Sequence, residues 1–277
     1  MGNLNGKVVL VTGAANGFGR EIAFRAAARG ATAVASDIDA SGAAEVASSI
    51  IATGGAALGL GLDVRDRQAF ADATSQVITQ YGRLDVLVNN AGVMPLAFLA
   101  DHARAADAWD RCIDINLKGV LHGVCAVYDQ MVRQNSGHIV NISSVYGNAG
   151  VAGAAVYSAT KAAVATLSNA LRVESQGRIK VTIVRPSGVV GTNLGATVLD
   201  PTAAAPLAAH RASEWQDNLA RYLEGKLDTE QTDPADARYW VLSPGEVAEH
   251  VVNVIDQPLG VAVTDLTLRA TGEDYVF

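Results

Sequence analysis

The chain has 277 residues, of which 49% are hydrophobic and 18% are charged, so it can bury a large core within one α/β domain. The formal net charge is −7 and Lys and Arg form no run, so a basic face for nucleic acid is not expected. No apolar stretch is long enough to span a membrane, and the polar N-terminus does not resemble a secretory signal. We therefore expect a cytoplasmic protein with neither nucleic-acid nor membrane partners.

Short apolar segments alternate with segments of helical periodicity from the N-terminus onward. The predicted strands cover residues 7–12, 32–36, 57–62, 84–88, 139–143, 179–184 and 264–268. The predicted helices cover residues 19–29, 39–53, 66–81, about 106–134, 157–175 and 246–255. Ser243, Pro244 and Glu246 form a capping box with proline at the first helical position, which marks the start of the last helix. This alternation predicts an α/β fold, a doubly wound parallel sheet covered by helices on both faces, in a single domain over residues 1–277.

Residues 193–243 interrupt this alternation. They hold three of the seven prolines and two of the three tryptophans. The segment is too long for an ordinary connection between a strand and a helix. We therefore expect it to form a lid or loop over a substrate site.

Cysteine and histidine spacing gives no sign of a metal site. Cys112 and Cys125 fall within one predicted helix, whose rise of about 1.5 Å per residue separates them too far for a disulfide. The five histidines form no HxH or HExxH pair. We expect two reduced thiols and no bound metal.

A glycine-rich turn follows the first predicted strand, with the sequence TGAANGFG at residues 12–19. Its glycines permit a tight turn, a close approach of the backbone to a pyrophosphate, and close packing of the next helix on the sheet. The N-terminus of that helix presents free N–H groups and a partial positive charge to phosphates. The residues expected to touch a dinucleotide here are Gly13, Asn16, Gly17, Phe18 and Gly19.

An acidic residue, Asp37, ends the second predicted strand, 24 residues after Gly13. A carboxylate there can accept hydrogen bonds from both ribose hydroxyls of adenosine and would repel a 2′-phosphate. No Arg or Lys lies within residues 14–18 or directly after Asp37, so the sequence favours NAD(H) over NADP(H). Ile38 would lie beside the same ribose. A helix N-cap is the alternative role for Asp37, although Asp39 and Ser41 can serve there.

Two further strand ends are predicted to face the cofactor. Asp63 and Val64 follow the third strand, where an acid and a backbone group could meet the adenine, although a turn or cap is also open for Asp63. The fourth strand ends in the sequence NNAG, whose small residues suit close approach to a cofactor and whose amides can tie neighbouring strands together. The residues expected to contact the cofactor from this second segment are Asn90, Ala91 and Gly92.

Tyr157 and Lys161 lie four residues apart on one face of a predicted helix. A nearby ammonium favours the phenolate and brings the tyrosine pKa toward the working range of an acid/base catalyst. Ser144 ends the preceding strand and could orient a substrate oxygen toward Tyr157, although Ser143 competes for this role. Asn116 is a poor helix former inside a long predicted helix. A break there would free a carbonyl to hold a water near Lys161 and so relay protons.

Together these motifs, in this order and at these spacings, resemble the compact single-domain branch of the short-chain dehydrogenase/reductase family. The resemblance covers about residues 7–195 and rests on TGAANGFG, Asp37, Asp63, NNAG at 89–92, Asn116, Ser144 and YSATK at 157–161. It implies a Rossmann-type fold and a Ser-Tyr-Lys triad with Asn. In such proteins the lysine also binds the nicotinamide ribose. It further implies a homodimer or homotetramer formed through the helices at 106–134 and 157–175.

The sequence departs from the family pattern at two places. The segment after the sixth strand, PSGVVGT at 186–192, is about one residue longer than the usual motif that touches the nicotinamide amide. The resemblance implies that Pro186, Gly188, Val189 and Thr192 contact the cofactor there. The usual glycine-rich ending is replaced by residues 270–277, which weakens the case for a tetramer.

These observations predict an NAD(H)-dependent oxidoreductase that interconverts a secondary alcohol and a ketone. The candidate substrate pocket is mostly apolar or aromatic, which favours a hydrophobic or aromatic small molecule. Its members are Met94, Leu96, Ser144, Val145, Tyr146, Val151, Tyr157, Leu194, Trp215 and Tyr222. Trp215 and Tyr222 could instead only pack the lid. A polyol or sugar dehydrogenase, an epimerase or dehydratase with tightly held NAD, and a non-catalytic NAD-binding regulator remain alternatives.

Overall fold

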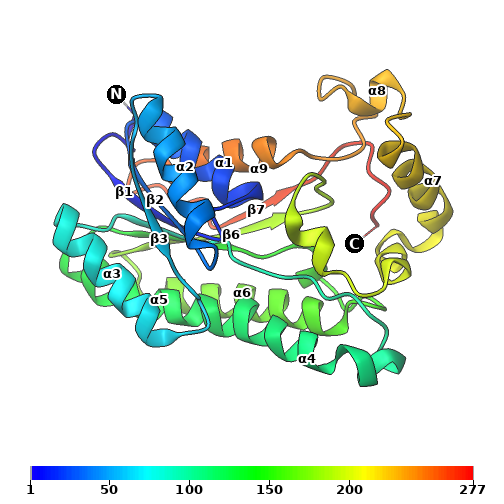
Figure 1. Ribbon diagram of the computed structural model, residues 1–277, viewed down its shortest axis with the longest axis horizontal. Coiled ribbons are helices and arrows are strands. Elements are labelled where there is room, and N and C mark those ends of the chain that lie inside the picture. Colours follow the sequence, from blue (N-terminus) through cyan, green and yellow to red (C-terminus); the bar gives the residue numbers. More distant parts are fainter. Residues whose placement is uncertain (1, 277) are drawn as a thin grey trace.

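A computed structural model, which describes residues 2–276, contains one sheet of seven parallel strands in the order β3-β2-β1-β4-β5-β6-β7 (Figure 1). All six neighbouring pairs are parallel, so the carboxyl ends of the strands meet at one edge. The strands are β1 (Val8–Thr12), β2 (Thr32–Asp37), β3 (Ala56–Gly61), β4 (Val86–Asn89), β5 (His138–Ile142), β6 (Lys180–Pro186) and β7 (Asp265–Leu268).

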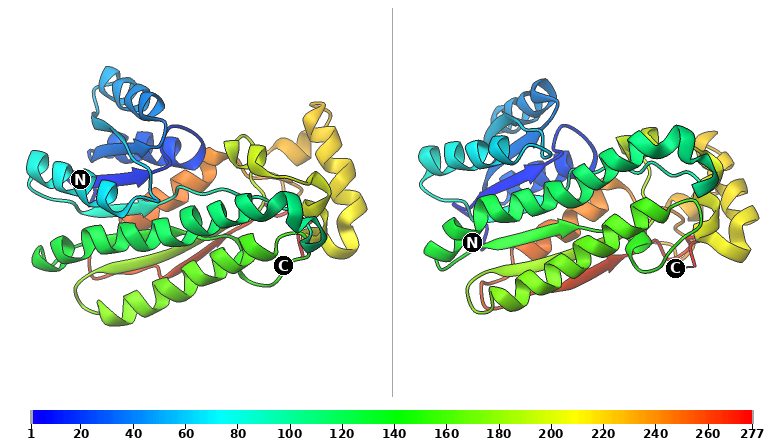
Figure 2. Two further views of the ribbon diagram at one scale, coloured as in Figure 1. Left: turned by 60° about the horizontal axis from the view of Figure 1, so that its bottom comes forward. Right: turned by 90° about the horizontal axis from the view of Figure 1, so that it is seen from below.

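Helices cover both faces of this sheet, which confirms the predicted fold class (Figures 1 and 2). On one face lie α1 (Gly17–Ala28), α2 (Ala40–Ala52) and α9 (Pro244–Ile255). On the other lie α3 (Arg67–Tyr81), α4 (His102–Ile113), α5 (Gly119–Arg133) and α6 (Ala155–Glu174). The predicted capping box of α9 is present, because Ser243 accepts a bond from the Glu246 N–H and the Glu246 carboxylate accepts one from the Ser243 N–H.

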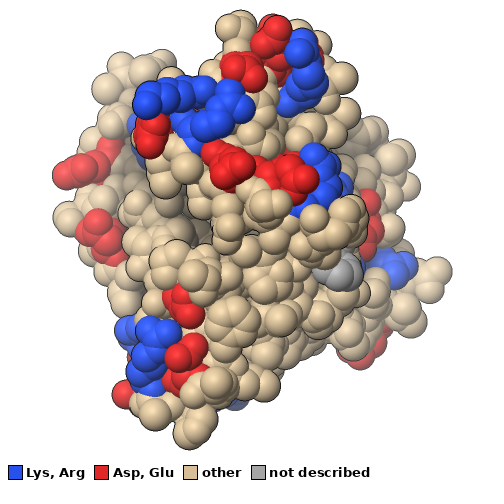
Figure 3. All heavy atoms as spheres, turned by 90° about the vertical axis from the view of Figure 1, so that its right-hand side faces the viewer, with Lys and Arg blue, Asp and Glu red and all other residues tan. Residues whose placement is uncertain are grey.

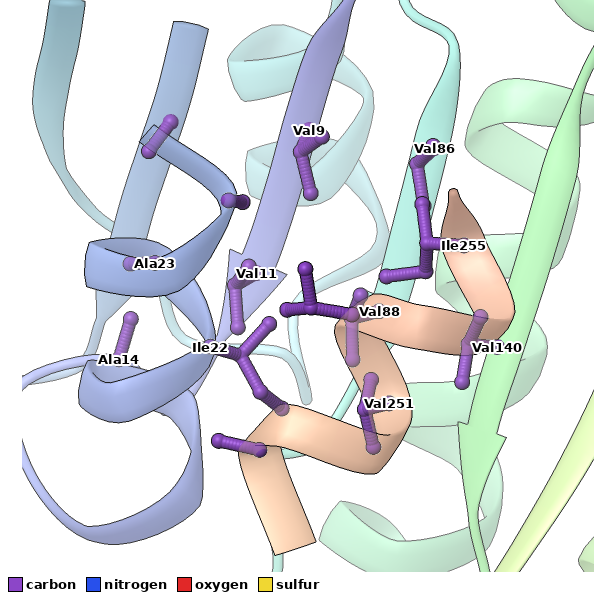
Figure 4. Close-up of a cluster of buried hydrophobic side chains, with 14 of the residues drawn as sticks. Val9, Val11, Ala14, Ile22, Ala23, Val86, Val88, Val140, Val251 and Ile255 are labelled. Atoms are coloured by element: carbon purple, nitrogen blue, oxygen red, sulfur yellow. The ribbon is translucent and has the colours of Figure 1, made fainter. Parts of the chain in front are cut away.

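The strand side chains alternate between two buried clusters. Val9 and Val11 of β1 pack with Ile22 of α1 and Val251 of α9 (Figure 4). Val8 and Leu10 of the same strand belong to the cluster on the opposite face, with the helices α3 and α5. Because both faces of each central strand are buried, the strands read as continuous apolar runs in the sequence.

The long helix expected at about 106–134 begins earlier, at His102, and is interrupted. A π-helical turn, Asp114–Lys118, separates α4 from α5 and carries Asn116. The expected break near Asn116 is therefore confirmed, as a change of hydrogen-bond register and not as a gap between helices. Such π turns are frequent at functional sites.

Residues 193–243 contain more regular structure than a loop. Two 3₁₀-helical segments, Asn193–Thr197 and Pro201–Arg211, precede α7 (Ala212–Leu223) and the short α8 (Thr229–Thr232). In Figure 1 these elements lie beyond the carboxyl ends of the strands, and the C-terminal segment of the chain runs beside them. We call residues 193–243 the lid for brevity, and their closing over a substrate remains a prediction. Within residues 2–276, no helix has both the length and the apolar character needed to cross a membrane.

The core beneath α1 and α9 generates a stability prediction. Ile22 has no exposed surface, whereas Ile51 of α2 is 56% exposed. We expect Ile22→Ala to lower the free energy of unfolding by about 2–5 kcal/mol, because it removes buried methyl groups and leaves a cavity. The matched exchange, Ile51→Ala, should change the free energy of unfolding by less than about 0.5 kcal/mol. Urea denaturation of both variants measures this, and equal losses would contradict the packing described.

Candidate active site

The glycine turn between β1 and α1 has the shape of a phosphate cradle. Gly13 and Gly17 have φ of 66° and 53°, a left-handed conformation that favours glycine. A Cβ on Gly13 would lie 2.9 Å from the Cα of Ala91, and one on Gly19 would overlap the carbonyl oxygen of Gly13. The N-cap of α1, Asn16, makes no side-chain capping bond in the part of the chain described. The first N–H groups of α1 are therefore available to an anion.

The NNAG segment closes this cradle from the next strand. The Asn90 side chain donates to the carbonyl oxygens of Thr12, at 2.8 Å, and Gly13, at 3.1 Å. The backbone N–H groups of Asn90 and Ala91 both donate to the Thr12 hydroxyl. Asn89 donates to Asn141 on β5 at 2.8 Å. The predicted role of these amides in tying strands together is thus observed.

Asp37 lies at the end of β2 with its side chain directed at the glycine turn. One carboxylate oxygen accepts a bond from the Ala15 N–H and the other from the Asp39 N–H, each at 3.0 Å. The N-cap of α2 is Asp39, which accepts a bond from the Gly42 N–H, so Asp37 does not serve as that cap. Ile38 beside it is exposed. Backbone bonds therefore hold Asp37 at the end of β2, and its contact with a ribose remains a prediction.

Asp63 has a different environment from the one that an adenine contact requires. Its carboxylate binds the Arg65 guanidinium and the Arg65 backbone N–H, and the Arg65 hydrogen bond lowers the pKa of Asp63. The structure thus displays the turn-stabilising alternative for Asp63, and its contact with adenine remains a prediction. The Val64 carbonyl lies 2.9 Å from His122 Nδ1 of α5.

The structure distinguishes the two candidate serines. The hydroxyl of Ser143 donates to the Lys161 carbonyl at 2.8 Å, so it is occupied in joining β5 to α6. The hydroxyl of Ser144 donates to the Pro186 carbonyl at 3.4 Å and accepts a bond from the Tyr146 N–H at 3.2 Å, and it lies near enough to Tyr157 to lower the pKa of that phenol. Of the two serines, Ser144 is therefore the one beside Tyr157, and its role toward a substrate remains a prediction.

Tyr157 and Lys161 are both buried, with 4% and 6% of their surfaces exposed. Burial raises the pKa of Tyr157, and the nearby Ser144 hydroxyl only partly opposes it. Burial lowers the pKa of Lys161 to about 8. Lys161 Nζ donates to the Ile142 carbonyl at 2.8 Å and lies 5.7 Å from the centroid of the Tyr157 ring. Loss of hydration therefore outweighs the effect of Ser144 on the Tyr157 pKa, and a lowering of that pKa by Lys161 remains a prediction.

Asn116 connects the π-helical turn to the cofactor edge. Its side chain donates to the Val93 carbonyl at 2.8 Å and accepts from the Val93 N–H at 2.9 Å. A Cβ on the neighbouring Gly92 would lie 3.3 Å from Asn116 Oδ1 and 3.7 Å from Lys161 Nζ. The cofactor edge therefore brings Asn116, Gly92 and Lys161 close together. A water relay through the Asn116 carbonyl remains a prediction.

Apolar side chains surround Tyr157 in a group that we call the Tyr157 cluster. The Tyr146 and Tyr157 rings meet edge to face, with centroids 5.4 Å apart. Of the predicted pocket residues, Leu96, Val145, Tyr146 and Val151 are buried here and Met94 packs against them. Leu194 belongs to the first lid segment, Asn193–Thr197. The Met94 N–H donates a hydrogen bond to the Thr197 hydroxyl of this segment. The buried members are Leu96, Cys112, Val145, Tyr146, Val151, Ala154, Tyr157, Ala203 and Leu207.

Trp215 and Tyr222 belong to a separate lid cluster, whose buried members are Ala205, Ala208, Trp215 and Trp240. Tyr222 packs against Trp240, with ring centroids 6.2 Å apart. Trp215 packs against Tyr275, with ring centroids 6.3 Å apart. The structure thus displays the lid-packing role for both residues and does not bring them into the Tyr157 cluster.

Sequence reasoning did not identify Tyr275. It lies beyond the last predicted strand, in a segment without periodicity, so no local signal shows where its ring points. In the structure the ring packs against Gly188, in the segment after β6. Thr192 of that segment borders the glycine turn, since a Cβ on Gly17 would lie 3.3 Å from Thr192 Cγ2. Val189 of the same segment forms an isolated β-bridge with Leu242.

This fold, its glycine cradle and the Ser144–Tyr157–Lys161 group together define an oxidoreductase that uses a nicotinamide cofactor. Residues 7–202 match the model of the short chain dehydrogenase family. The chain belongs to the short-chain dehydrogenase/reductase family.

Relatives and solved structures agree with this assignment. An uncharacterized oxidoreductase of Listeria monocytogenes is 32% identical over 272 residues, which cover 98% of this chain and 99% of the relative. A cyclopentanol dehydrogenase of Comamonas is 38% identical over 201 residues, 72% of this chain and 79% of the relative. The crystal structure of a metagenomic short-chain oxidoreductase in complex with NADP is 27% identical, with a TM-score of 0.73 over 97% of this chain and 99% of that one.

The crowded glycine turn generates a binding prediction. A methyl group on Gly19 must displace the Gly13 carbonyl or the Asn90 side chain, so Gly19→Ala should weaken cofactor binding about tenfold or more. The matched variant Gly260→Ala, whose added Cβ would meet nothing within 4 Å, should bind like the parent. Fluorescence titration with NADH and NADPH measures both, and unchanged binding in Gly19→Ala would contradict the cradle.

Proposed function

We propose that this protein is an NAD(H)-dependent oxidoreductase that interconverts secondary alcohols and ketones with hydrophobic or aromatic substituents. The observation that supports it best is the pair of neighbouring hydroxyls on Ser144 and Tyr157, where the buried Tyr157 is enclosed by apolar side chains. Such a site can hold one polar oxygen of a substrate whose remaining surface is apolar.

The proposed chemistry at the substrate oxygen is a proton transfer through Tyr157. The nicotinamide, when bound, accepts or supplies the hydride. In oxidation the phenolate of Tyr157 removes the hydroxyl proton, and in reduction the neutral phenol protonates the developing alkoxide. Ser144 donates to the same oxygen and orients it. Lys161 binds the nicotinamide ribose and carries charge near Tyr157, while Asn116 holds the adjacent loop through Val93.

The surroundings of Tyr157 support an apolar substrate. Leu96, Val145 and Tyr146 enclose it, and the lid adds Leu207. Figure 3 shows the lid end of the molecule, where charged side chains gather in separate groups around a broad uncharged area. A polyol or sugar would leave hydroxyl groups unpaired against these apolar side chains, which costs free energy.

Asp37 supports NAD(H) as the cofactor, although the metagenomic relative was crystallised with NADP. Both Asp37 oxygens accept backbone bonds, so the carboxylate is held in place at the point where an adenosine ribose would lie. A 2′-phosphate would bring a second negative charge close to it, without a compensating cation within residues 14–18.

Asp37 thus generates a prediction about cofactor preference. We expect the parent protein to prefer NAD, and Asp37→Ser to lower kcat/KM for NAD about 10–100-fold, since hydrogen bonds to charged groups contribute about 1.5–3 kcal/mol. The same variant should use NADP better than the parent does. Asp39→Ser removes the same charge two residues away and keeps a helix cap, so it should leave the preference unchanged. A parent that turns over only with NADP would refute this role of Asp37.

Tyr157 generates a prediction about turnover and pH. Tyr157→Phe should lower kcat by at least about 10²–10⁴-fold and leave NADH binding nearly intact, whereas Tyr128→Phe on α5 should be neutral. Because the pKa of Tyr157 is raised, the phenol predominates at neutral pH. Alcohol oxidation should therefore accelerate from pH 7 to 10, while ketone reduction should not. Strong residual activity in Tyr157→Phe, or oxidation that slows with rising pH, would remove Tyr157 from this role.

Absorbance of NADH during incubation with a panel of aliphatic, aromatic, steroid and polyol alcohols tests the proposal directly. Turnover with NAD on an apolar class is the expected result. Turnover confined to polyols would favour the polar-substrate alternative. Tight NADH binding without turnover of any alcohol would favour a cofactor-binding regulator.

A further inference from the structure

The C-terminal segment after β7, residues 269–276, crosses between the catalytic site and the lid. Tyr275 packs against both the Tyr157 cluster and the lid cluster. Its ring borders Gly188, where an added Cβ would lie 2.9 Å from the Tyr275 hydroxyl. Tyr275 therefore stands at the boundary between the catalytic tyrosines and the aromatic residues of the lid.

Buried polar contacts hold this segment in place. Asp274 is 1% exposed, and its carboxylate accepts bonds from Trp240 Nε1, at 2.7 Å, and Asn218 Nδ2, at 3.0 Å. It also pairs with Arg211 at 2.6 Å, at the start of α7. The neighbouring Glu273 is hydrogen-bonded to Ser187 after β6. The segment is thus fixed both to the lid and to the loop beside the catalytic site.

A partly open cavity of about 60 Å³ borders Tyr275, between the lid, the segment after β6 and the C-terminal segment. Trp215, Leu219 and Trp240 line it together with Tyr275. This space exceeds what one water needs and can accept a small group of atoms. Tyr275 thus lines this cavity and also packs against the Tyr157 cluster.

We propose that Tyr275 is a specificity-determining residue whose ring closes the far wall of the substrate site and limits the size of the group beyond the reacting carbon. The inference rests on the proposed alcohol/ketone chemistry. Removing the ring would join the substrate site to the cavity and admit bulkier apolar ketones. Burial raises the pKa of Tyr275 to about 12, so its hydroxyl stays neutral and the wall remains uncharged at physiological pH.

The test compares reduction of cyclopentanone with reduction of 2-acetylnaphthalene by the parent and by Tyr275→Ala. We expect Tyr275→Ala to raise the ratio of kcat/KM for the large ketone to that for the small one by tenfold or more, mainly through KM. Tyr275→Leu keeps apolar packing, guards against a folding failure, and should shift the ratio in the same direction. Tyr275→Phe keeps the ring and should leave the ratio within about twofold of the parent.

Tyr222→Ala provides the matched control, because Tyr222 packs in the lid against Trp240 and does not contact the Tyr157 cluster. If Tyr275→Ala acted only by loosening the lid, Tyr222→Ala would raise the ratio of kcat/KM for the large ketone to that for the small one just as strongly. That result would overturn the proposal. An unchanged ratio in folded Tyr275→Ala and Tyr275→Leu would overturn it as well.

A binding measurement separates this proposal from the proposed function. Calorimetry with NADH and 2-acetylnaphthalene on Tyr157→Phe, with and without Tyr275→Ala, requires no turnover. Tighter binding of the large ketone in the double variant supports the wall, and equal binding refutes it. Absence of turnover in the parent on either ketone would count against the alcohol/ketone chemistry, while the binding comparison would still decide the role of Tyr275.

Discussion

The parallel direction of all seven strands is the constraint on which the site depends. It brings the ends of β1, β2, β4, β5 and β6 to one edge, although they lie far apart in the sequence. The glycine turn after β1 can pack against Asn90 after β4 only because these two strands are neighbours. Ser144 reaches Tyr157 for the same reason, since β5 delivers it to the edge where α6 begins.

Burial of the catalytic group has an electrostatic consequence. Removing Tyr157 and Lys161 from water favours the uncharged form of each, which raises one pKa and lowers the other. The Ser144 hydroxyl opposes this at Tyr157. A site of this kind favours the neutral phenol of Tyr157 over its phenolate.

Buried polar contacts join the lid to the C-terminal segment. Asp274 joins the end of the chain to Trp240, Asn218 and Arg211, so the lid does not rest on the catalytic residues alone. Ser144 is positioned by the end of β5 and Tyr157 by the start of α6, whereas the lid and the C-terminal segment are joined to each other by these polar contacts.

Much of the fold and of the cofactor edge follows from local sequence patterns. Several features are local, because each depends on residues within about one turn or strand. They are the apolar runs of β1 and β5, the turn at 12–19, the capping box at Ser243 and the spacing of Tyr157 and Lys161. Contacts between segments that are distant in the sequence decide other features. They select Ser144 over Ser143 and separate Trp215 from the Tyr157 cluster. Tyr275 is the clearest case, since its position is decided by Gly188 and Trp215, which are 87 and 60 residues away along the chain. Periodicity and spacing describe neighbours in sequence, whereas these side chains are placed by packing between segments that only the folded chain brings together.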